Sequence, residues 1–384
     1  MTAGGGLKKK VCIVVSSEMT VKTFLKCHIL ALVKYYEVTL IVNTTSLDFA
    51  ELNELPIKVI PVAIERSIKP IADMRALYEL ISIFKKQRFD IVHSVTPKAG
   101  LLAMLAGKVA RVPFRIHMFT GQVWANKVSI ARFLLRWVDY ILAGAATHLL
   151  ADSFSQKAFL LEEGITCSRK IGVLADGSIC GVDTNKFKPN NLARLGIREK
   201  LNIHNNDIIL IFMGRLSRDK GILDLAAAFT NIAGDLSNLH LLVVGEDEGG
   251  LQGEIECIVR EDYVSRLHFI EHTDQPEKYL AAADILCLPS YREGFGNVII
   301  EAAACGVPAI GSNIYGLSDA VSDGETGMLF EVGNKTELTA MIRGLADDSK
   351  QREKLSQAAL DRVRNVFPTK RLVDAWLNYY NRLL

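Results

Sequence analysis

The chain has 384 residues, of which 49% are hydrophobic, so it is long enough to fold as two domains with separate cores. No run of about 18 residues is free of charged and polar interruptions, which argues against a transmembrane helix. The net charge is +2, but residues 1–187 carry 24 Lys and Arg against 15 Asp and Glu, whereas the remainder carries 21 against 28. Unless these lysines serve solubility alone, the basic half favours an anionic partner, and a membrane fits better than nucleic acid because no zinc-finger spacing, RNP-like motif or dense basic tract is present.

The N-terminus and the cysteines favour a cytoplasmic protein. The first residues lead through three lysines into an apolar strand, without the apolar region of a signal peptide. The seven cysteines show no C-x-x-C spacing, and Cys12 and Cys287 lie in apolar runs typical of a reduced core. We therefore expect a cytoplasmic location, with peripheral attachment to the inner face of the membrane as an extension.

Apolar strands and amphipathic helices alternate along the N-terminal half. This pattern predicts a parallel, doubly wound α/β sheet with strands at residues 11–15, 38–43, 90–94 and 114–119. The alternation stops in a polar stretch, residues 177–206, and restarts at Ile208. We therefore place one domain at 1–187, a linker at 188–206 and a second domain at 207–368.

One apolar segment of the first half, residues 128–151, allows two interpretations. It combines Arg132 and Arg136 with large apolar residues that include Phe133, Leu134 and Trp137. As a helix it can pack in the core of its domain or rest on an anionic membrane surface. The sequence leaves both open.

The second domain begins with an apolar strand, a polar loop and a helix, over residues 208–229. Arg215 and Lys220 lie in this loop, where Arg218 and Asp219 read as ordinary solvated residues. A diphosphate leaving group gains charge as its bond to a sugar breaks, and fixed cations stabilise that charge more than the ground state. The loop is therefore a candidate diphosphate site.

A second strand, loop and helix follow near residue 285, and the loop reads EGFGNVIIEAAACGVP from residue 293. Gly294 and Gly296 let backbone N–H groups approach a ligand, and the helix N-terminus attracts anions. Glu293 lies on the loop, whereas Glu301 lies one turn into the helix, where a carboxylate can accept hydroxyl hydrogen bonds from a ribose or a sugar. A Gly-x-Gly turn and two glutamates can also occur by chance.

The two loops together resemble the signature of the family 4 retaining glycosyltransferases, enzymes of the GT-B fold. The Glu-x7-Glu motif matches Glu293 and Glu301, and the Gly-Arg pair followed by a Lys-Gly pair in the other loop matches Gly214, Arg215 and Lys220, with four residues between Arg215 and Lys220. The resemblance implies that Glu293 lies by the transferred sugar, that Glu301 binds the nucleotide ribose, and that Arg215 and Lys220 bind the donor diphosphate. It implies further donor contacts from Gly294, Phe295, Gly296, Asn297 and Val298.

The GT-B resemblance implies two Rossmann-like domains that face each other across a cleft. GVD-x3-F-x-P, from Gly181, resembles the linker region of such enzymes, and the last helix, 369–384, is expected to return to the first domain. His117 resembles the histidine that family members place beside the donor sugar. Acceptor-side contacts are expected from Ser16, Ser17, Lys98, Thr120 and Trp124, although Trp124 can equally be a packing residue. Ser16 and Ser17 stand where the family often has a Gly-Gly turn, so that phosphate contact is open.

The implied activity is transfer of a hexosyl or N-acetylhexosaminyl group from a nucleotide sugar, most simply a UDP-sugar, to a saccharide acceptor. HSVTPKAGLLA, from His93, and FTGQVW, from Phe119, resemble enzymes that build surface polysaccharides or O-antigen on a lipid carrier. No Asp-x-Asp occurs, so we expect no metal, and the nucleotide sugar is a co-substrate, so we expect no cofactor. A UDP-sugar 2-epimerase of the same fold and a non-catalytic nucleotide-sugar-binding protein remain alternatives. A nicotinamide enzyme does not fit, because no G-x-G-x-x-G follows an early strand.

Overall fold

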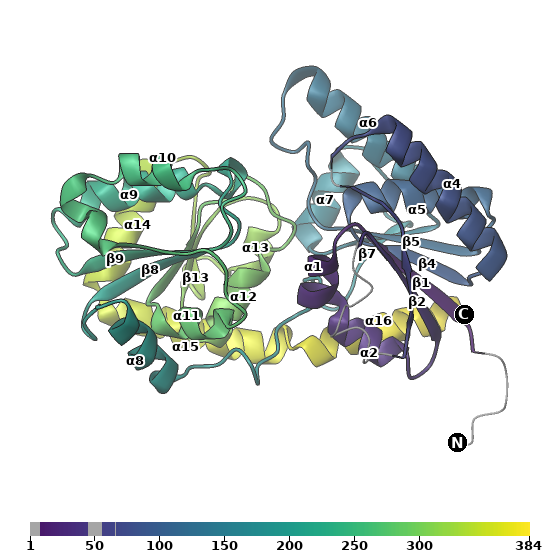
Figure 1. The fold of residues 1–384 in the computed structure, drawn as a ribbon. Coiled ribbons are helices and arrows are strands. Elements are labelled where there is room, and N and C mark those ends of the chain that lie inside the picture. The colour runs from purple at the N-terminus through teal and green to yellow at the C-terminus, as the bar shows by residue number, and fades with distance from the viewer. Residues whose placement is uncertain (1–7, 45–55, 66) are drawn as a thin grey trace. The chain divides into compact units, whose positions relative to one another are not determined.

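The computed structural model describes residues 8–44, 56–65 and 67–384. The chain forms two compact units (Figure 1). Unit 1 comprises residues 1–180 together with 370–384, and unit 2 comprises residues 181–369. Both are doubly wound α/β units with all-parallel sheets, which confirms the predicted fold class.

Unit 1 contains a sheet of seven strands in the order β3-β2-β1-β4-β5-β6-β7. The order reverses at β1, which pairs with β2 on one side and β4 on the other. The strands are β1 (Lys10–Val15), β2 (Glu37–Val42), β3 (Lys58–Pro61), β4 (Ile91–Ser94), β5 (Phe114–Phe119), β6 (His148–Ala151) and β7 (Ile171–Val173).

Alternate side chains of β1 show why helices cover both faces of this sheet. Val11, Ile13 and Val15 join the core on one face, whereas Cys12 and Val14 join the core on the other. The face of Val11 carries the π-helical segment η1 (Val21–Leu25), α2 (Lys26–Leu32) and α16 (Thr369–Leu383), and the face of Cys12 carries α4 (Pro70–Gln87), α5 (Pro97–Val109), α6 (Ser129–Ala145) and α7 (Phe154–Glu162). A short helix, α1 (Glu18–Thr20), precedes η1.

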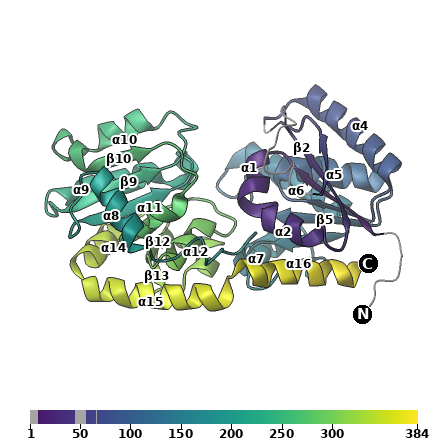
Figure 2. The ribbon, with the colours of Figure 1, turned by 60° about the horizontal axis from the view of Figure 1, so that its bottom comes forward.

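Helix α16 is tied to unit 1 through Trp376, and α2 lies beside it (Figure 2). The indole stacks between the imidazoles of His28 and His93, with ring centroids 4.3 Å and 4.5 Å away. Tyr380 adds a 2.7 Å hydrogen bond to Nδ1 of His93. Burial lowers the pKa of His93 to about 3, so the imidazole is neutral, and it is part of the core.

Unit 2 contains six strands in the order β10-β9-β8-β11-β12-β13, and its order reverses at β8. The strands are β8 (Ile208–Met213), β9 (Leu239–Val244), β10 (Leu267–Ile270), β11 (Ile285–Leu288), β12 (Ala309–Ser312) and β13 (Gly327–Phe330). The α-helices are α8 (Asn191–Lys200), α9 (Ile222–Ala233), α10 (Gln252–Ile258), α11 (Pro276–Ala282), α12 (Asn297–Ala304), α13 (Leu317–Ala320), α14 (Lys335–Asp347) and α15 (Ser349–Val366), and the 3₁₀ helices are η2 (Arg218–Lys220) and η3 (Glu261–Arg266).

The predicted linker, 188–206, contains helix α8 and belongs to unit 2, so that boundary needs correction. Arg194 and Arg198, one turn apart, both bind the carboxylate of Asp284, at 2.7 and 2.6 Å. They also donate to the last carbonyls of α11, and Arg198 is fully buried. Because arginines rather than an apolar stripe anchor this helix, its sequence reads as a polar linker.

The segment at 128–151 is likewise not one helix. Helix α6 ends at Ala145, and Ala146 is already extended, with ψ 151°. Residues 148–151 then form β6, in the interior of the sheet. Within the described part of the chain, no helix combines the length and apolar character needed to cross a membrane.

Candidate functional site

Most of the predicted donor residues lie at one edge of the unit 2 sheet. They occupy the loops that follow β8 and β11, neighbouring strands on the two sides of the point where strand order reverses. In open α/β sheets, ligands bind outside the carboxyl ends of strands at such a reversal. The fold therefore brings together two loops that are about eighty residues apart in sequence.

The two loops touch closely at Gly221, the residue before α9. Its φ is 70°, and a Cβ there would lie 1.9 Å from the carbonyl oxygen of Pro289. Only glycine fits this contact without a backbone shift. A similar approach occurs at Gly245, where a Cβ would lie 1.9 Å from the carbonyl oxygen of Gly214.

Lys220 and Glu293 form an ion pair across the two loops. Oε1 of Glu293 accepts hydrogen bonds from Nζ of Lys220 at 2.5 Å and from Oγ of Ser290 at 2.9 Å. The two charged side chains are only 19% and 12% exposed, so solvent screens the pair weakly. The second cation, Arg215, binds Glu248 at 2.6 Å in a more open position.

Further polar contacts brace the loop after β11. Arg292 binds Asp219 at 2.8 Å, and the N–H of Tyr291 donates to the Asp219 carbonyl oxygen at the same distance. The Tyr291 hydroxyl donates to Asp224 at 2.6 Å, and this hydrogen bond is the main reason that its pKa rises to about 12. Asp219 is thus a structural contact rather than the solvated residue that the sequence suggested.

The N-terminus of α12 completes this edge. Gly296, the N-cap residue, has φ 78° and no side chain of its own to cap the helix, and Asn297 and Val298 form the first turn. A Cβ on Gly296 would lie 2.4 Å from the side chain of Leu317, so a larger residue would clash at this position. Glu301 lies in the second turn, half-buried, and burial raises its pKa to about 7 while Lys186 acts in the opposite direction.

The corresponding edge of unit 1 holds neutral groups. Ser16, at the end of β1, shares a 2.9 Å hydrogen bond with the Thr96 hydroxyl. His117 is buried, its Nδ1 lies 2.9 Å from Oγ of Ser94, and burial lowers its pKa to about 3. Its Nε2 has no hydrogen-bond partner among the described residues. A Cβ on Gly100 would lie 2.3 Å from the imidazole of His117, so the ring can occupy this position only because residue 100 has no side chain.

Three predicted site residues make contacts within the protein that account for their positions. Trp124 is 1% exposed and donates to Asp139 at 2.7 Å, so the packing interpretation holds. Phe295 is 2% exposed and packs edge-on against Phe367 in the core of unit 2, which leaves only its backbone for a ligand. Lys98 is bound to Asp73 at 2.5 Å.

Two other predicted acceptor-side residues remain at loop positions of unit 1. Ser17 precedes α1 without capping it, and Thr120 directly follows β5; both are half-buried. Neither has a ligand-directed contact that distinguishes it from an ordinary loop residue.

Sequence reasoning missed the two partners of the charged loops. Ser290 follows β11 at the strand's carboxyl end, a position that could have singled it out. Glu248 lies in the acidic turn after β9, whose charge is visible in the sequence but whose target, Arg215, is not. As for metals, no group of three His, Cys, Asp or Glu side chains is arranged to hold an ion within residues 8–44, 56–65 and 67–384.

Comparisons with known proteins agree with this architecture. Residues 194–362 match the family described as "Glycosyl transferases group 1", and residues 31–170 match the "Glycosyl transferase 4-like domain". The capsular polysaccharide biosynthesis glycosyltransferase CapM of Staphylococcus aureus is 30% identical over 347 residues, which cover 89% of this chain and 90% of CapM. The UDP-Gal:alpha-D-GlcNAc-diphosphoundecaprenol alpha-1,3-galactosyltransferase of Escherichia coli is 28% identical over 322 residues, which cover 82% and 81% of the two chains.

A solved structure extends the likeness to the fold. Anabaena Alr3699/HepE in complex with UDP and glucose superposes with a TM-score of 0.79 at 17% identity, over 97% of this chain and 99% of that one. The chain therefore belongs to the family 4 glycosyltransferases of the GT-B fold.

Proposed function

We propose that the protein is a retaining glycosyltransferase that moves a hexosyl or N-acetylhexosaminyl group from a UDP-sugar to a lipid-linked saccharide in surface polysaccharide synthesis. The names of CapM and of the Escherichia coli galactosyltransferase support the pathway, the donor and the diphosphoundecaprenol-linked acceptor. The neighbour that binds UDP and glucose supports the donor class.

The observation that carries the proposal is the pairing of Lys220 with Glu293 beside the N-terminus of α12. In the proposed complex, Lys220 and Arg215 contact the donor diphosphate, and the helix N-terminus adds partial positive charge. Glu293 then contacts the transferred sugar, and Glu301 accepts hydrogen bonds from the ribose hydroxyls. Fixed cations favour the transition state because negative charge grows on the diphosphate as it leaves.

The proposed reaction exchanges one bond of the sugar for another on the same face. The C1–O bond to the diphosphate breaks, a C1–O bond to the acceptor hydroxyl forms, and the hydroxyl proton passes to a phosphate oxygen of the leaving group. The protein contributes orientation and electrostatic stabilisation, without a covalent intermediate. In this scheme the reaction needs neither a cofactor nor a metal ion, so excess EDTA leaves turnover largely intact; an activity restored only by magnesium or manganese would contradict the scheme.

A donor panel tests the proposal. Purified protein is incubated with UDP- and GDP-sugars, with and without a diphosphoprenyl saccharide, and nucleotide release and the anomer of the product are measured. We expect UDP release only with acceptor and a product that keeps the donor configuration. An epimerised UDP-sugar without acceptor would indicate a 2-epimerase, and donor binding without any release would indicate a binding protein.

A further inference from the structure

Helix α6 turns its large apolar side chains toward solvent. These residues recur at the three- and four-residue spacing of one helix face, and their exposed fractions lie between 56% and 75%: Ile130, Phe133, Leu134, Trp137 and Tyr140. A helix of a globular protein ordinarily buries such a stripe against the core. The exposure here therefore calls for a partner.

The opposite side of α6 carries polar residues that are held inside. Asp139 is buried and accepts a hydrogen bond from the indole of Trp124. Arg132 and Arg136 both pair with Glu163, just after α7. Because these polar contacts fix the rotation of the helix, the apolar stripe cannot turn inward without breaking them.

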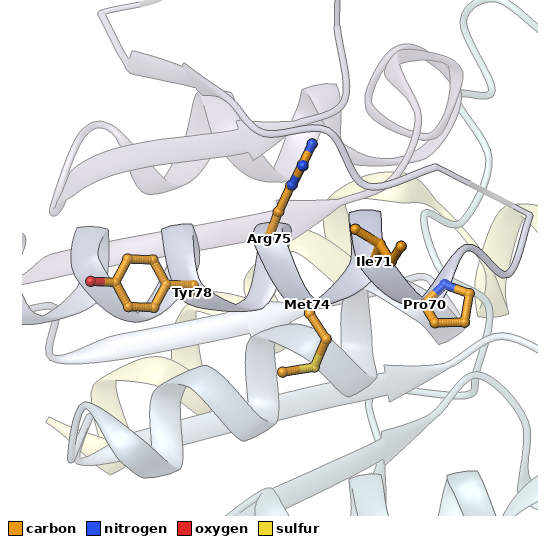
Figure 3. Close-up of a pocket in the computed structure, with 5 residues that line it drawn as sticks. All are labelled: Pro70, Ile71, Met74, Arg75 and Tyr78. Carbon is orange, nitrogen blue, oxygen red and sulfur yellow. The ribbon is translucent and has the colours of Figure 1, made fainter.

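Helix α4 presents a second apolar stripe on the same side of the unit 1 sheet. Ile71, Met74 and Tyr78 project from it around a shallow hollow and are between 65% and 77% exposed (Figure 3). Helices α4 and α6 both pack against α5, and the three share the core on one sheet face. We call these two exposed stripes together the α4–α6 face.

The charges around this face are predominantly positive. Arg75 lines the hollow on α4, Lys85 and Lys86 lie in the last turn of that helix, and Lys127 comes just before α6; all four are exposed. Glu79 is an exposed carboxylate of α4, whereas Asp73 pairs with Lys98 and Asp139 is buried. A second copy of the same face would bring two positive surfaces together, whereas an anionic bilayer complements both the charge and the apolar stripe.

We propose that the α4–α6 face is a lipid-binding surface that rests on an anionic bilayer, with the side chains of Phe133, Trp137 and Tyr78 in the headgroup region. Trp and Tyr suit that region because their rings are partly apolar and partly polar. The inference rests on the proposed function, since a lipid-linked acceptor has to be reached at a membrane. It deepens that function by naming the surface that binds there.

Trp137 provides a direct readout in the unmodified protein. The other two tryptophans, Trp124 and Trp376, are each 1% exposed, whereas Trp137 is 57% exposed. Vesicles of phosphatidylglycerol and phosphatidylethanolamine should shift the tryptophan emission to the blue and protect it from acrylamide. Phosphatidylcholine vesicles should do neither, and salt at about 1 M should reverse the effect because it shortens the range of the charges. Emission that no vesicle changes would overturn the proposal.

A double variant with a matched control tests the location of the surface. Phe133→Ser with Leu134→Ser should lower vesicle partitioning on the order of tenfold or more, because two apolar side chains no longer leave water. Leu192→Ser removes an 84% exposed leucine of α8 in unit 2 and should bind vesicles like the unmodified protein. Equal partitioning of the double variant would overturn the proposal, as would a dimer in lipid-free solution that the double variant abolishes, since a second copy would then occupy the face.

The same variants separate this inference from the transferase assignment. The double variant should release UDP at the normal rate with a short-chain, water-soluble acceptor and more slowly only with acceptor held in vesicles. Normal vesicle binding together with no turnover on any donor would sink the transferase proposal and leave the surface standing. Normal turnover without vesicle binding would overturn the lipid-binding surface and leave the transferase proposal standing.

Discussion

The carboxyl-end loops of the two sheets differ in chemistry although the strands that position them have the same arrangement. In unit 2, ion pairs dominate: Lys220 with Glu293, and Arg215 with Glu248. In unit 1, the side chains at the corresponding strand ends are neutral, with Ser16 bonded to Thr96 and His117 bonded to Ser94, and the ion pair of Lys98 with Asp73 lies between the first turns of α5 and α4. One fold thus offers a charged edge suited to a diphosphate and a neutral edge suited to hydroxyl groups. The side chains in the loops, rather than the strand topology, determine which chemistry each edge has.

The largest expected effect comes from removing the cations of the charged edge. Lys220→Ala and Arg215→Ala should each lower turnover about a hundredfold, since a preorganised charge at a leaving group stabilises the transition state by about 3 kcal/mol. Arg218→Ala is the matched control, because Arg218 lies in the same loop but pairs with Glu254, and its side chain is 69% exposed. Turnover close to normal in a folded Lys220 or Arg215 variant would remove that residue from the mechanism.

The contact between the two loops predicts a large effect on stability. Gly221→Ala should destabilise unit 2 by at least about 1 kcal/mol more than Gly250→Ala. Both glycines have positive φ, 70° and 64°, so both variants carry the backbone strain of about 1–2 kcal/mol. Only at Gly221 does the new Cβ also meet a carbonyl oxygen, whereas nothing lies within 4 Å of a Cβ at Gly250. Equal free energies of unfolding for the two variants would show that the loops can separate freely.

The pKa of Glu301 predicts a pH dependence of donor binding. Its value of about 7 lies above the ordinary range of a carboxyl, so the ionised form is disfavoured by burial, and stability falls as the pH rises through 7. Ribose binding through a carboxylate requires that ionised form, so UDP affinity should fall severalfold as the pH drops below about 7. In Glu301→Gln the affinity should be low and independent of pH over this range; a pH dependence that persists would place the titrating group elsewhere.

A smaller effect is expected at the more open ion pair. Glu248→Gln should lower the KM for the donor a few-fold without changing kcat, because Arg215 then meets the diphosphate without a competing carboxylate. The gain is limited, since exposed ion pairs contribute about 0.2–1 kcal/mol. Glu254→Gln, which alters the similarly exposed pair with Arg218, serves as control. A raised KM in Glu248→Gln would mean that Glu248 positions Arg215 rather than competes for it.

The residues of the charged edge are easier to find in the sequence than those of the neutral edge, for a physical reason. Arg215, Lys220 and Glu293 each follow a strongly apolar strand and have glycines nearby, so a local pattern in the sequence marks them. The contact between the two loops at Gly221 follows from the order of the strands in the sheet. Trp124 is held in the core by its hydrogen bond to Asp139, and no local pattern in the sequence reveals that these two side chains pair. Helix α8 was missed because two arginines that share Asp284 replace an apolar stripe.

The most direct test of the account compares the binding of UDP and uridine by calorimetry. The two ligands differ only in the diphosphate, so their difference in affinity measures what the charged edge of unit 2 recognises. We expect UDP to bind much more tightly than uridine to the unmodified protein and to Arg218→Ala, and we expect this difference to shrink strongly in Lys220→Ala and Arg215→Ala. An undiminished preference for UDP in both of the latter variants would contradict the assignment of these loops to the donor diphosphate.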